Sequence, residues 1–425
     1  MYFMLKTSYI IDNKKEVIES LKKRNFKSEV LIDKLISFDN ERKVLQTDYE
    51  SKLSKSNSIS KTIGQLFKEG KKNETIILKE ESLKIKQETK LLSEKLNDVK
   101  TKIDNILYQI PNVPNKNVPT GNTQEDNVVI FESDLNINPS SNIPHWDLAE
   151  KYDIIDFEMG NKITGSGFPV YKGQGAKLQR ALISFFLDCN ISFGYEEVQV
   201  PHLVNEQSAF GTGQLPDKEG QMYSIPEDNL FLIPTAEVPI TNIFRNEIID
   251  ESKLPILKTG YTPCFRREAG SYGSHVRGLN RLHQFDKVEI VRVDHPENSY
   301  NSLELMKDQI KSVIEKIELP FRIITLCGGD LGFTSALTYD FEIYSPAQDK
   351  WLEVSSVSNF ETFQSNRLKI RYRNSEGKTN LAHTLNGSSL ALPRVLATLI
   401  ENNQSDDGIK IPKVLQPYTG FSLIK

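Results

Sequence analysis

The sequence predicts an α+β protein: an N-terminal arm of two antiparallel helices paired as a coiled coil, then a domain with a mostly antiparallel sheet flanked by helices. Three observations predict this class. Apolar residues before position 110 recur at heptad spacing, and no proline precedes Pro111. A proline-rich segment follows at 111–121. Beyond it, short β-branched and aromatic runs are interspersed with a few helical patterns.

Length and composition limit the function classes. The 425 residues are too many for one ordinary domain and enough for two. Hydrophobic residues make up 38% and charged residues 26%, which is typical of a soluble globular protein. The net charge of −4 argues against a generally basic nucleic-acid binder, so any such contact requires a local basic patch.

The cysteines and the apolar runs indicate the cellular compartment and whether zinc is bound. The three cysteines are scattered, and none has the spacing of a zinc site, so we expect a reducing compartment and no zinc. No apolar run reaches 18 residues, and the N-terminus has no secretory leader. These features predict a cytoplasmic protein with no membrane association.

The predicted arm covers residues 1–110. Its two apolar stripes indicate long helices that meet near Gly70 and bury the stripes against each other. Arg42 interrupts the first stripe. The first stripe comprises Leu31, Leu35, Phe38, Leu45 and Tyr49; the second comprises Leu78, Ile85, Leu92, Leu96, Val99, Ile103, Ile106 and Ile110.

A helix of some 35 residues is roughly 50 Å long, so such a hairpin must project. Lysines are spread along it, and this charge pattern alone is more typical of a solvated coiled-coil surface. The second interpretation is an arm that grips an extended polyanion such as RNA. The lysines are Lys43, Lys52, Lys55, Lys61, Lys68, Lys71 and Lys72.

The second domain is predicted to cover 122–425, after a linker at 111–121 whose three prolines end the arm. Its strand patterns are closely spaced with few helices between them, which favours antiparallel pairing. Strands are predicted at 195–200, 230–233, 287–293, 322–325, 340–345 and 351–354. Helices are predicted at 177–189, 237–246, 300–317 and 389–403.

Common nucleotide-binding and hydrolytic motifs are missing from the sequence. It contains no GxxxxGK[ST] loop, no GxGxxG after a Rossmann-type strand, no GxSxG elbow and no HExxH. Any ATP chemistry must therefore use another fold.

The segment 265–293, FRREAGSYGSHVRGLNRLHQFDKVEIVRV, concentrates arginine in a glycine-containing loop between two predicted strands. Arginine suits polyphosphates because its planar fork makes bidentate, charge-assisted hydrogen bonds. An exposed basic loop with ordinary ion pairs is the alternative, but FRRE followed by a Gly/Arg loop and HQF is too particular for it. The arginines are Arg266, Arg267, Arg277, Arg281 and Arg292.

This segment closely resembles motif 2 of the class II aminoacyl-tRNA synthetases, in its bacterial seryl form. Other segments agree in the expected order: GYEEVQVPHLV from Gly194 resembles motif 1, and LPR at 392–394 resembles motif 3. TAEVP at 235–239 and TLNGS at 384–388 resemble serine-pocket segments, and EVSS at 353–356 resembles the metal and ATP segment. The projecting hairpin resembles the tRNA-binding arm of that family.

The resemblance implies a serine–tRNA ligase that uses ATP and Mg²⁺, and it assigns roles to residues. Arg266 would hold the α-phosphate and the serine carboxylate, and Glu268 would bind the adenine amino group. Phe285 would stack under the adenine, with Arg394 on the other face clamping the γ-phosphate. The remaining implied ATP contacts are Arg267, Glu353, Val354, Ser355 and Ser356, of which Glu353 and Ser356 would hold Mg²⁺.

The resemblance also implies a serine pocket. Its lining would be Thr235, Ala236, Glu237, Glu289 and Ser388. The alternatives at single positions are structural: Glu237 also suits the first turn of a helix that starts there. Strand alternation is expected to point Arg267 away from Arg266. We assign no acid–base role to His275 or His283.

The implied partners are L-serine, tRNA(Ser) with tRNA(Sec) as a further substrate, and a second copy of the chain in a homodimer built on motif 1. Two other functions stay open at this point. One is a synthetase-like ligase that loads a carrier protein, whose relatives lack the long arm. The other is a coiled-coil scaffold with a degenerate synthetase domain, which predicts gaps among Arg266, Glu268, Glu353 and Arg394; all four are present.

Overall fold

The computed structural model describes residues 5–135, 139–217, 220–268 and 277–425, which form two compact units. The first unit contains the residues up to Lys22 and Phe26–Pro111. The second contains Lys23–Asn25 and Asn112–Lys425. Nearly all of the segment expected as a linker, 111–121, therefore belongs to the second unit, where Asn112 and Asn115 donate backbone hydrogen bonds to Phe333 and Ala336.

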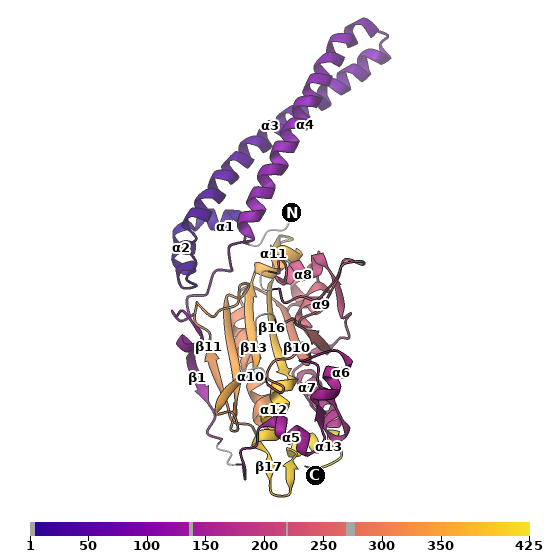
Figure 1. Cartoon of the computed structure of the whole chain (residues 1–425). Helices are drawn as coiled ribbons and strands as arrows, with labels where there is room; N and C mark the ends of the chain where they lie inside the picture. The colour runs from indigo at the N-terminus through magenta and orange to yellow at the C-terminus, as the bar shows by residue number, and fades with distance from the viewer. Residues whose placement is uncertain (1–4, 136–138, 218–219, 269–276) are drawn as a thin grey trace. The chain divides into compact units, whose positions relative to one another are not determined.

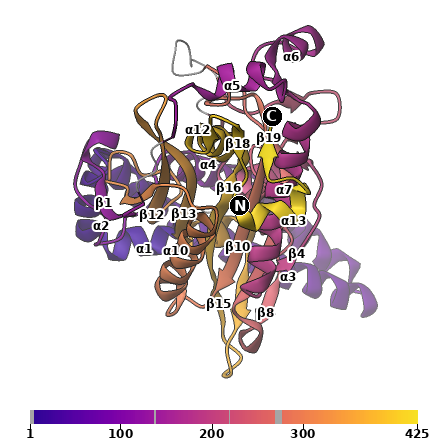
Figure 2. The ribbon, with the colours of Figure 1, turned by 90° about the horizontal axis from the view of Figure 1, so that it is seen from below.

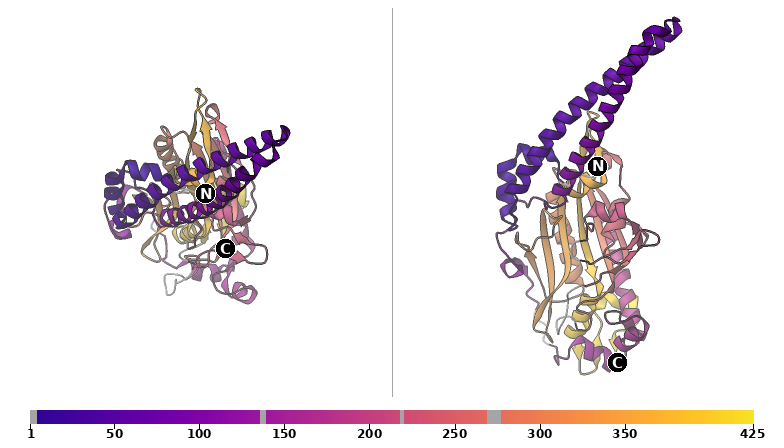
Figure 3. Two further views of the ribbon diagram at one scale, coloured as in Figure 1. Left: turned by 90° about the horizontal axis from the view of Figure 1, so that it is seen from above. Right: turned by 45° about the horizontal axis from the view of Figure 1, so that its top comes forward.

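The first unit is helical and is built on a long hairpin. Helices α3 and α4 have 40 and 33 residues and run side by side in opposite directions, as Figures 1 and 3 show. Gly70, with φ +76°, lies in the turn between them, as the sequence predicts. The helices are α1 Thr7–Asp12, α2 Lys14–Lys22, α3 Glu29–Lys68, η1 Lys72–Glu74 and α4 Thr75–Leu107.

The hairpin interface is apolar near its base and more polar toward its tip. The predicted stripe of α4 is largely confirmed, since Leu96, Val99 and Ile103 are buried. At the start of the predicted α3 stripe the buried residue is Ile32 rather than Leu31, which is only partly buried, whereas the predicted Leu35 is fully buried. Farther out, Ser56 is one of the buried polar residues.

Ion pairs cross the hairpin and show which residues of α3 and α4 lie opposite each other. Lys52 Nζ lies 2.5 Å from Glu88 Oε2, and Lys55 Nζ lies 2.7 Å from Glu81 Oε1. These exposed pairs add little stability individually. They show that two of the lysines that stud the arm have a carboxylate beside them, on the neighbouring helix.

The second unit is organised around an eight-stranded sheet with the order β1-β11-β12-β13-β16-β10-β9-β4. All neighbours in it pair antiparallel except β4 and β9, which are parallel. Its strands are β1 Val128–Glu132, β4 Glu196–Glu197, β9 Ile256–Phe265, β10 Gln284–Asp294, β11 Phe321–Thr325, β12 Leu337–Ser345, β13 Lys350–Glu361 and β16 His383–Ala391.

Helices and small sheets complete this unit. The helices are α5 His145–Lys151, α6 Phe157–Ile163, α7 Gly173–Ser192, α8 Glu206–Thr212, α9 Glu237–Asn242, α10 Ser299–Lys316, α11 Phe363–Leu368, α12 Leu392–Asn402 and α13 Gln416–Thr419, with short 3₁₀ turns η2 Gln124–Asp126, η3 Glu251–Lys253 and η5 Lys413–Leu415. The small sheets contain β2 Ile155–Asp156 and β3 Val170–Tyr171; β5 Leu203–Asn205, β6 Ser224–Ile225 and β7 Leu230–Leu232; β8 Ile248–Asp250, β14 Arg371–Arg373 and β15 Thr379–Leu381; and β17 Gln404–Ser405, β18 Gly408–Lys410 and β19 Leu423–Ile424.

Three predicted elements need correction. The helix expected at 237–246 ends at Asn242. The strand expected at 195–200 is reduced to the two residues of β4. The helix expected from 389 begins at Leu392, because β16 continues to Ala391 as a paired strand. Pro393 then occupies the first turn of α12, where the missing N–H has no helical partner to lose.

The two faces of the large sheet differ in character. Lys287 and Glu289 of β10 line a cavity, whereas the alternating residues Val288 and Ile290 belong to the main apolar core. Residues of α7, α10 and α12 complete that core, and Figure 2 shows these helices against the sheet. One face is therefore sealed by helices, and the other carries polar groups. No helix in the described part of the chain combines the length and apolar character of a membrane span.

Candidate active site

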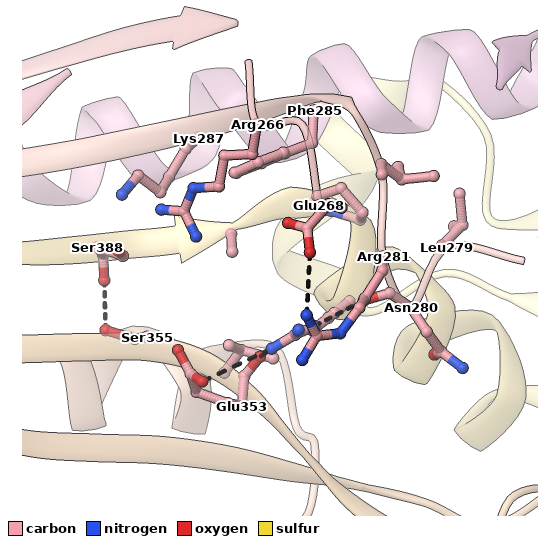
Figure 4. Close-up of a pocket in the computed structure, with 15 residues that line it drawn as sticks. Arg266, Glu268, Leu279, Asn280, Arg281, Phe285, Lys287, Glu353, Ser355 and Ser388 are labelled. Carbon is pink, nitrogen blue, oxygen red and sulfur yellow. Dashed lines mark hydrogen bonds and ion pairs between the residues drawn. The ribbon is translucent and has the colours of Figure 1, made fainter. Parts of the chain in front are cut away.

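Two adjoining cavities, of about 220 and 540 Å³, open on the polar face of the sheet. Strands β10, β13 and β16 and the start of α12 supply part of the lining, and loops supply most of the rest, including the residues that follow β9. Figure 4 shows the side chains around the smaller cavity. Six residues line both cavities: Arg266, Glu268, Arg281, Lys287, Glu353 and Ser388.

The β9–β10 hairpin positions the first arginine. Phe265 is the last residue of β9 and pairs with Gln284, so Arg266 directly follows the strand. The Arg266 Nε donates to the Pro234 carbonyl (3.3 Å), and its guanidinium carbon lies 5.2 Å from the centre of the Phe285 ring. The site thus contains a fixed cation next to an aromatic face.

Glu268 follows at the start of the loop between the strands. It adopts a left-handed backbone with φ +47°, and its carboxylate accepts a hydrogen bond from Arg281 at 3.0 Å. A non-glycine residue in this region is uncommon and marks a locally constrained backbone. The glycine-rich part of this loop, including His275, lies outside the described residues.

Arg394 reaches the same cavity from the first turn of α12. Its Nε donates to the Asn280 carbonyl (3.1 Å), and its Nη1 donates to the Glu353 carbonyl (2.8 Å). Two backbone acceptors from separate segments therefore fix the guanidinium plane. Arg394 and Arg266 together make this cavity cationic.

A β-bulge brings Glu353 and Ser356 to the same side of β13. The register with β12 shifts between Phe341 and Glu342, which leaves Val354 without an opposite residue. In a regular strand, residues three apart point to opposite faces. Here the Ser356 hydroxyl donates to the Glu353 carboxylate at 3.3 Å.

The second cavity ends in two buried carboxylates, Glu237 and Glu289. Glu289 Oε2 lies 2.6 Å from Lys287 Nζ and accepts the Thr235 hydroxyl at 3.2 Å. Glu237 accepts a hydrogen bond from the Gln364 amide at 2.6 Å. Lys287 thus neutralises Glu289, whereas Glu237 has a neutral partner.

This asymmetry appears in the proton affinity of Glu237. Burial, followed by the nearby charge of Glu289, raises the pKa of Glu237 to about 7, although Gln364 and Lys287 oppose the shift. Asp340 lies on β12, next to β13 and outside the two cavities. Burial and then the charge of Glu353 raise the pKa of Asp340 well above its ordinary value. The larger cavity therefore ends in a carboxyl group, Glu237, whose ionised form a bound cation would favour.

The structure brings most of the predicted site residues together, but not all. The two cavities are lined by Thr235, Glu237, Arg266, Glu268, Phe285, Glu289, Glu353, Val354, Ser355, Ser356, Ser388 and Arg394. Ala236 lines neither and packs in an apolar cluster with Val200 and Ile240. Arg267 also lies outside both, with its guanidinium over the Tyr223 ring.

Some residues of the site were not among those predicted. Phe285, Lys287 and Glu289 are alternate residues of one strand, and alternate residues point to the same face. This spacing was the signal that could have added Lys287 to the predicted site. Asn280 accepts from Arg394 through its backbone carbonyl, and Gln364 donates to Glu237 through its side-chain amide. No pattern in the sequence indicates either contact. Gln364 comes from α11 and reaches Glu237 only in the folded chain.

The charge arrangement suits a ligand with two distinct ends. The smaller cavity is lined by arginines, which suit an anionic group such as a polyphosphate, and by an aromatic ring, which suits a flat ring system. The larger cavity offers buried carboxylates and hydroxyls to a small cation with polar groups. No set of three or more His, Cys, Asp or Glu side chains in the described ranges is arranged to hold a metal ion.

Comparison with known proteins gives a consistent assignment for both units. The family model described as the seryl-tRNA synthetase N-terminal domain matches residues 4–114, and that of the class II tRNA synthetase core domain (G, H, P, S and T) matches 222–403. The serine–tRNA ligase of Salinibacter ruber is 47% identical and that of Thermodesulfovibrio yellowstonii 44% identical, covering 99% of this chain and 99% and 100% of theirs. A crystal structure of the Pyrococcus horikoshii seryl-tRNA synthetase with ATP superimposes with a TM-score of 0.89, at 33% identity over 99% of both chains.

Proposed function

Because this chain belongs to the seryl-tRNA synthetases, we propose that its two adjoining cavities together form the site where serine and ATP react. The enzyme activates L-serine with ATP to seryl-adenylate and then transfers serine to tRNA. The observation that supports this location is the juxtaposition of an arginine-rich cavity with buried carboxylates across Arg266 and Lys287.

The smaller cavity takes ATP. Phe285 stacks on one adenine face and Arg394 covers the other, while Glu268 accepts from the adenine amino group. Arg266, next to the boundary of the two cavities, holds the α-phosphate and the serine carboxylate. The reaction gathers negative charge on phosphate oxygens, so fixed cations stabilise the transition state, and no protein nucleophile is needed.

Glu353 and Ser356 are suited to hold Mg²⁺. They present a carboxylate and a hydroxyl oxygen, which are hard donors, and the bulge in β13 points them together. Mg²⁺ commonly uses one or two carboxylates, with phosphates and waters completing its shell. Bound there, Mg²⁺ would neutralise phosphate charge and help to orient the oxygens.

The larger cavity selects serine. The ammonium group lies against Glu237 and Glu289, and Thr235 and Ser388 provide polar contacts at the pocket wall. A pocket that hydrogen-bonds the serine hydroxyl can reject alanine by roughly 10⁴-fold, since its own polar groups would otherwise be left unpaired. Threonine must instead be excluded by shape, because it adds only a methyl group.

The helical hairpin is proposed to bind tRNA(Ser), and tRNA(Sec) as a second substrate. In α3, residues 51–68 contain four lysines and no acidic residue. Lys52 and Lys55 each lie beside a carboxylate of α4, so the local positive charge comes mainly from Lys61 and Lys68. We assign 1–110 to this arm, 111–121 to a connector and 122–425 to catalysis. A cytoplasmic homodimer completes the proposal, with motif 1 at the interface.

The test is amino-acid-dependent ATP–pyrophosphate exchange with all twenty amino acids, without tRNA. Exchange with serine alone is expected. Exchange with another amino acid would retain the adenylation site but overturn the assigned pocket. No exchange from folded protein with Mg²⁺ would overturn the proposed site as a whole. The carrier-protein alternative loses its basis, because the long arm that such ligases lack is present.

A further inference from the structure

A buried polar cluster lies behind the ATP cavity. It contains His145 at the start of α5 and Glu401 near the end of α12, both fully buried. His145 Nδ1 lies 2.7 Å from Glu401 Oε1, and the His145 backbone N–H donates to the same oxygen at 3.0 Å. A buried carboxylate is costly unless it is hydrogen-bonded, so this pair has to be explained.

The other imidazole nitrogen holds the loop that borders the cavity. The Leu279 backbone N–H donates to His145 Nε2 at 2.9 Å. That nitrogen must therefore be the acceptor, which leaves the proton on Nδ1, where it donates to Glu401. Gly278 packs so closely that a Cβ there would lie 2.3 Å from Nε2.

A second branch of the cluster holds the next residue of the loop. Gln348 Nε2 donates to the Ser345 hydroxyl at 3.0 Å, and Ser345 donates to Glu401. The side-chain oxygen of Gln348 (Oε1) accepts a hydrogen bond from the side-chain amide of Asn280 (Nδ2) at 2.8 Å. Two chains of hydrogen bonds from one carboxylate thus converge on 279–280.

Asn280 connects this cluster to the catalytic arginine. Its backbone carbonyl accepts the Arg394 Nε, as described above. Arg394 and Glu401 lie on the same helix, α12, so the cluster links two turns of that helix through the loop. None of His145, Ser345 or Glu401 lines either cavity.

We propose that His145, oriented by Glu401, is a positioning residue for ATP: it fixes 278–280 so that the Asn280 carbonyl aims Arg394 into the cavity. The inference rests on the proposed role of Arg394. A small displacement of a positioned group can cost up to roughly 100-fold in rate, so the effect should be measurable.

Two substitutions of His145 separate its two hydrogen bonds. In His145→Asn the side-chain amide can still donate to Glu401, but it no longer reaches Leu279 N–H. In His145→Gln the amide oxygen lies near the Nε2 position and can accept from Leu279. His383→Asn serves as the matched control, because His383 is mostly buried, bonds Ser299 at 2.7 Å and lines neither cavity.

The experiment measures the KM for ATP and the KM for serine in pyrophosphate exchange, and the Kd for ATP by calorimetry, on the full-length enzyme. His145→Asn should raise the KM and Kd for ATP by roughly 10-fold to 100-fold. The KM for serine should stay within about twofold, His145→Gln should recover most of the loss, and His383→Asn should leave both KM values unchanged. A wild-type KM for ATP in folded His145→Asn, or an equal rise in both KM values, would overturn the proposal.

A double-mutant cycle tests whether the effect passes through Arg394. In an Arg394→Ala background, His145→Asn should change the Kd for ATP by less than about twofold, and an undiminished effect would contradict the inference. If His145→Asn does not fold, Gln348→Ala is the second variant, because it removes the hydrogen-bond partner of the Asn280 side chain. Gln348→Ala must raise the KM for ATP and not the KM for serine. An unchanged KM for ATP in this variant overturns the proposal. Normal exchange in Arg394→Ala alone would instead refute the proposed role of Arg394.

Discussion

Among single residues, Glu237 differs from Glu289 in the charge of its partner. Lys287 lies beside Glu289, whereas the partner of Glu237 is the neutral amide of Gln364. The ammonium group of serine would supply the missing positive charge. Substrate binding and the ionisation of Glu237 are therefore coupled.

The KM for serine should depend on pH through Glu237. With a pKa of about 7 in the free enzyme, this carboxyl is protonated as the pH falls, and a neutral carboxyl cannot pair with an ammonium group. We expect the KM for serine to rise about tenfold from pH 8 to pH 6. Glu237→Gln should bind serine weakly with little pH dependence, and a flat wild-type profile over this range would contradict the prediction.

The same carboxyl should cost the free enzyme stability. Its pKa in the folded state lies above the ordinary 4.5, so the unfolded chain releases the proton first as the pH rises. The contribution of Glu237 to the free energy of unfolding therefore falls between pH 4.5 and 7, by on the order of 3 kcal/mol. Glu237→Gln should be more stable than the wild type at pH 8 in denaturant titrations without serine, and equal stability there would count against the raised pKa.

Arg394 should be essential for chemistry but not for folding. It is held by two backbone carbonyls at the cavity edge, and its removal leaves both accessible to water. Arg394→Ala should lose at least 100-fold in pyrophosphate exchange while its melting temperature changes little. Arg373→Ala, at an exposed position of β14, is the control and should behave as the wild type. Wild-type exchange by Arg394→Ala would refute the role of this residue.

At the scale of elements, the bulge in β13 and the hairpin of α3 and α4 carry separate parts of the function. The bulge turns Ser356 toward Glu353, which a regular strand would not do. In the hairpin, the Lys52–Glu88 pair shows which residues lie opposite each other, so the hairpin can be shortened at a known point. The two elements can thus be altered independently.

A shortened hairpin should separate the two reactions. Replacing 53–87 with a glycine-rich turn closes the hairpin at the Lys52–Glu88 pair and removes the lysine-rich part. We expect aminoacylation of tRNA(Ser) to fall by at least 100-fold while exchange with serine remains near the wild-type rate. Lys61→Gln with Lys68→Gln, in the full-length arm, shows how much of the loss is due to charge. Loss of both reactions in the shortened enzyme would contradict this division of labour.

Over the whole molecule, negative net charge coexists with local basic segments. Phosphate contacts release counterions, so their contribution to tRNA affinity falls steeply with salt. The kcat/KM for tRNA should therefore drop by roughly tenfold or more from 50 to 200 mM salt. Pyrophosphate exchange, whose charged contacts lie in cavities, should change much less over the same range. An equal response of both reactions would argue against electrostatic binding of tRNA.

The sequence by itself predicted the long helices, the antiparallel sheet and most of the residues that line the two cavities. Heptad spacing gave the two long helices, because an apolar stripe must be buried against a partner. The resemblance of ordered motifs to a known family singled out Arg266, Glu268, Glu353 and Arg394, and the fold brings all four to one cavity. These predictions depend on local patterns, which the chain carries without reference to its fold.

Only the tertiary structure decided how distant segments meet. The bulge that turns Ser356 toward Glu353 depends on the register of β12, and the neutral partner of Glu237 comes from α11. The helix expected from 389 starts later because β16 pairs with its neighbours up to Ala391. Hydrogen bonds between segments far apart in the chain leave no periodic trace in the sequence, since each partner is selected by proximity in the fold and not by spacing along the chain.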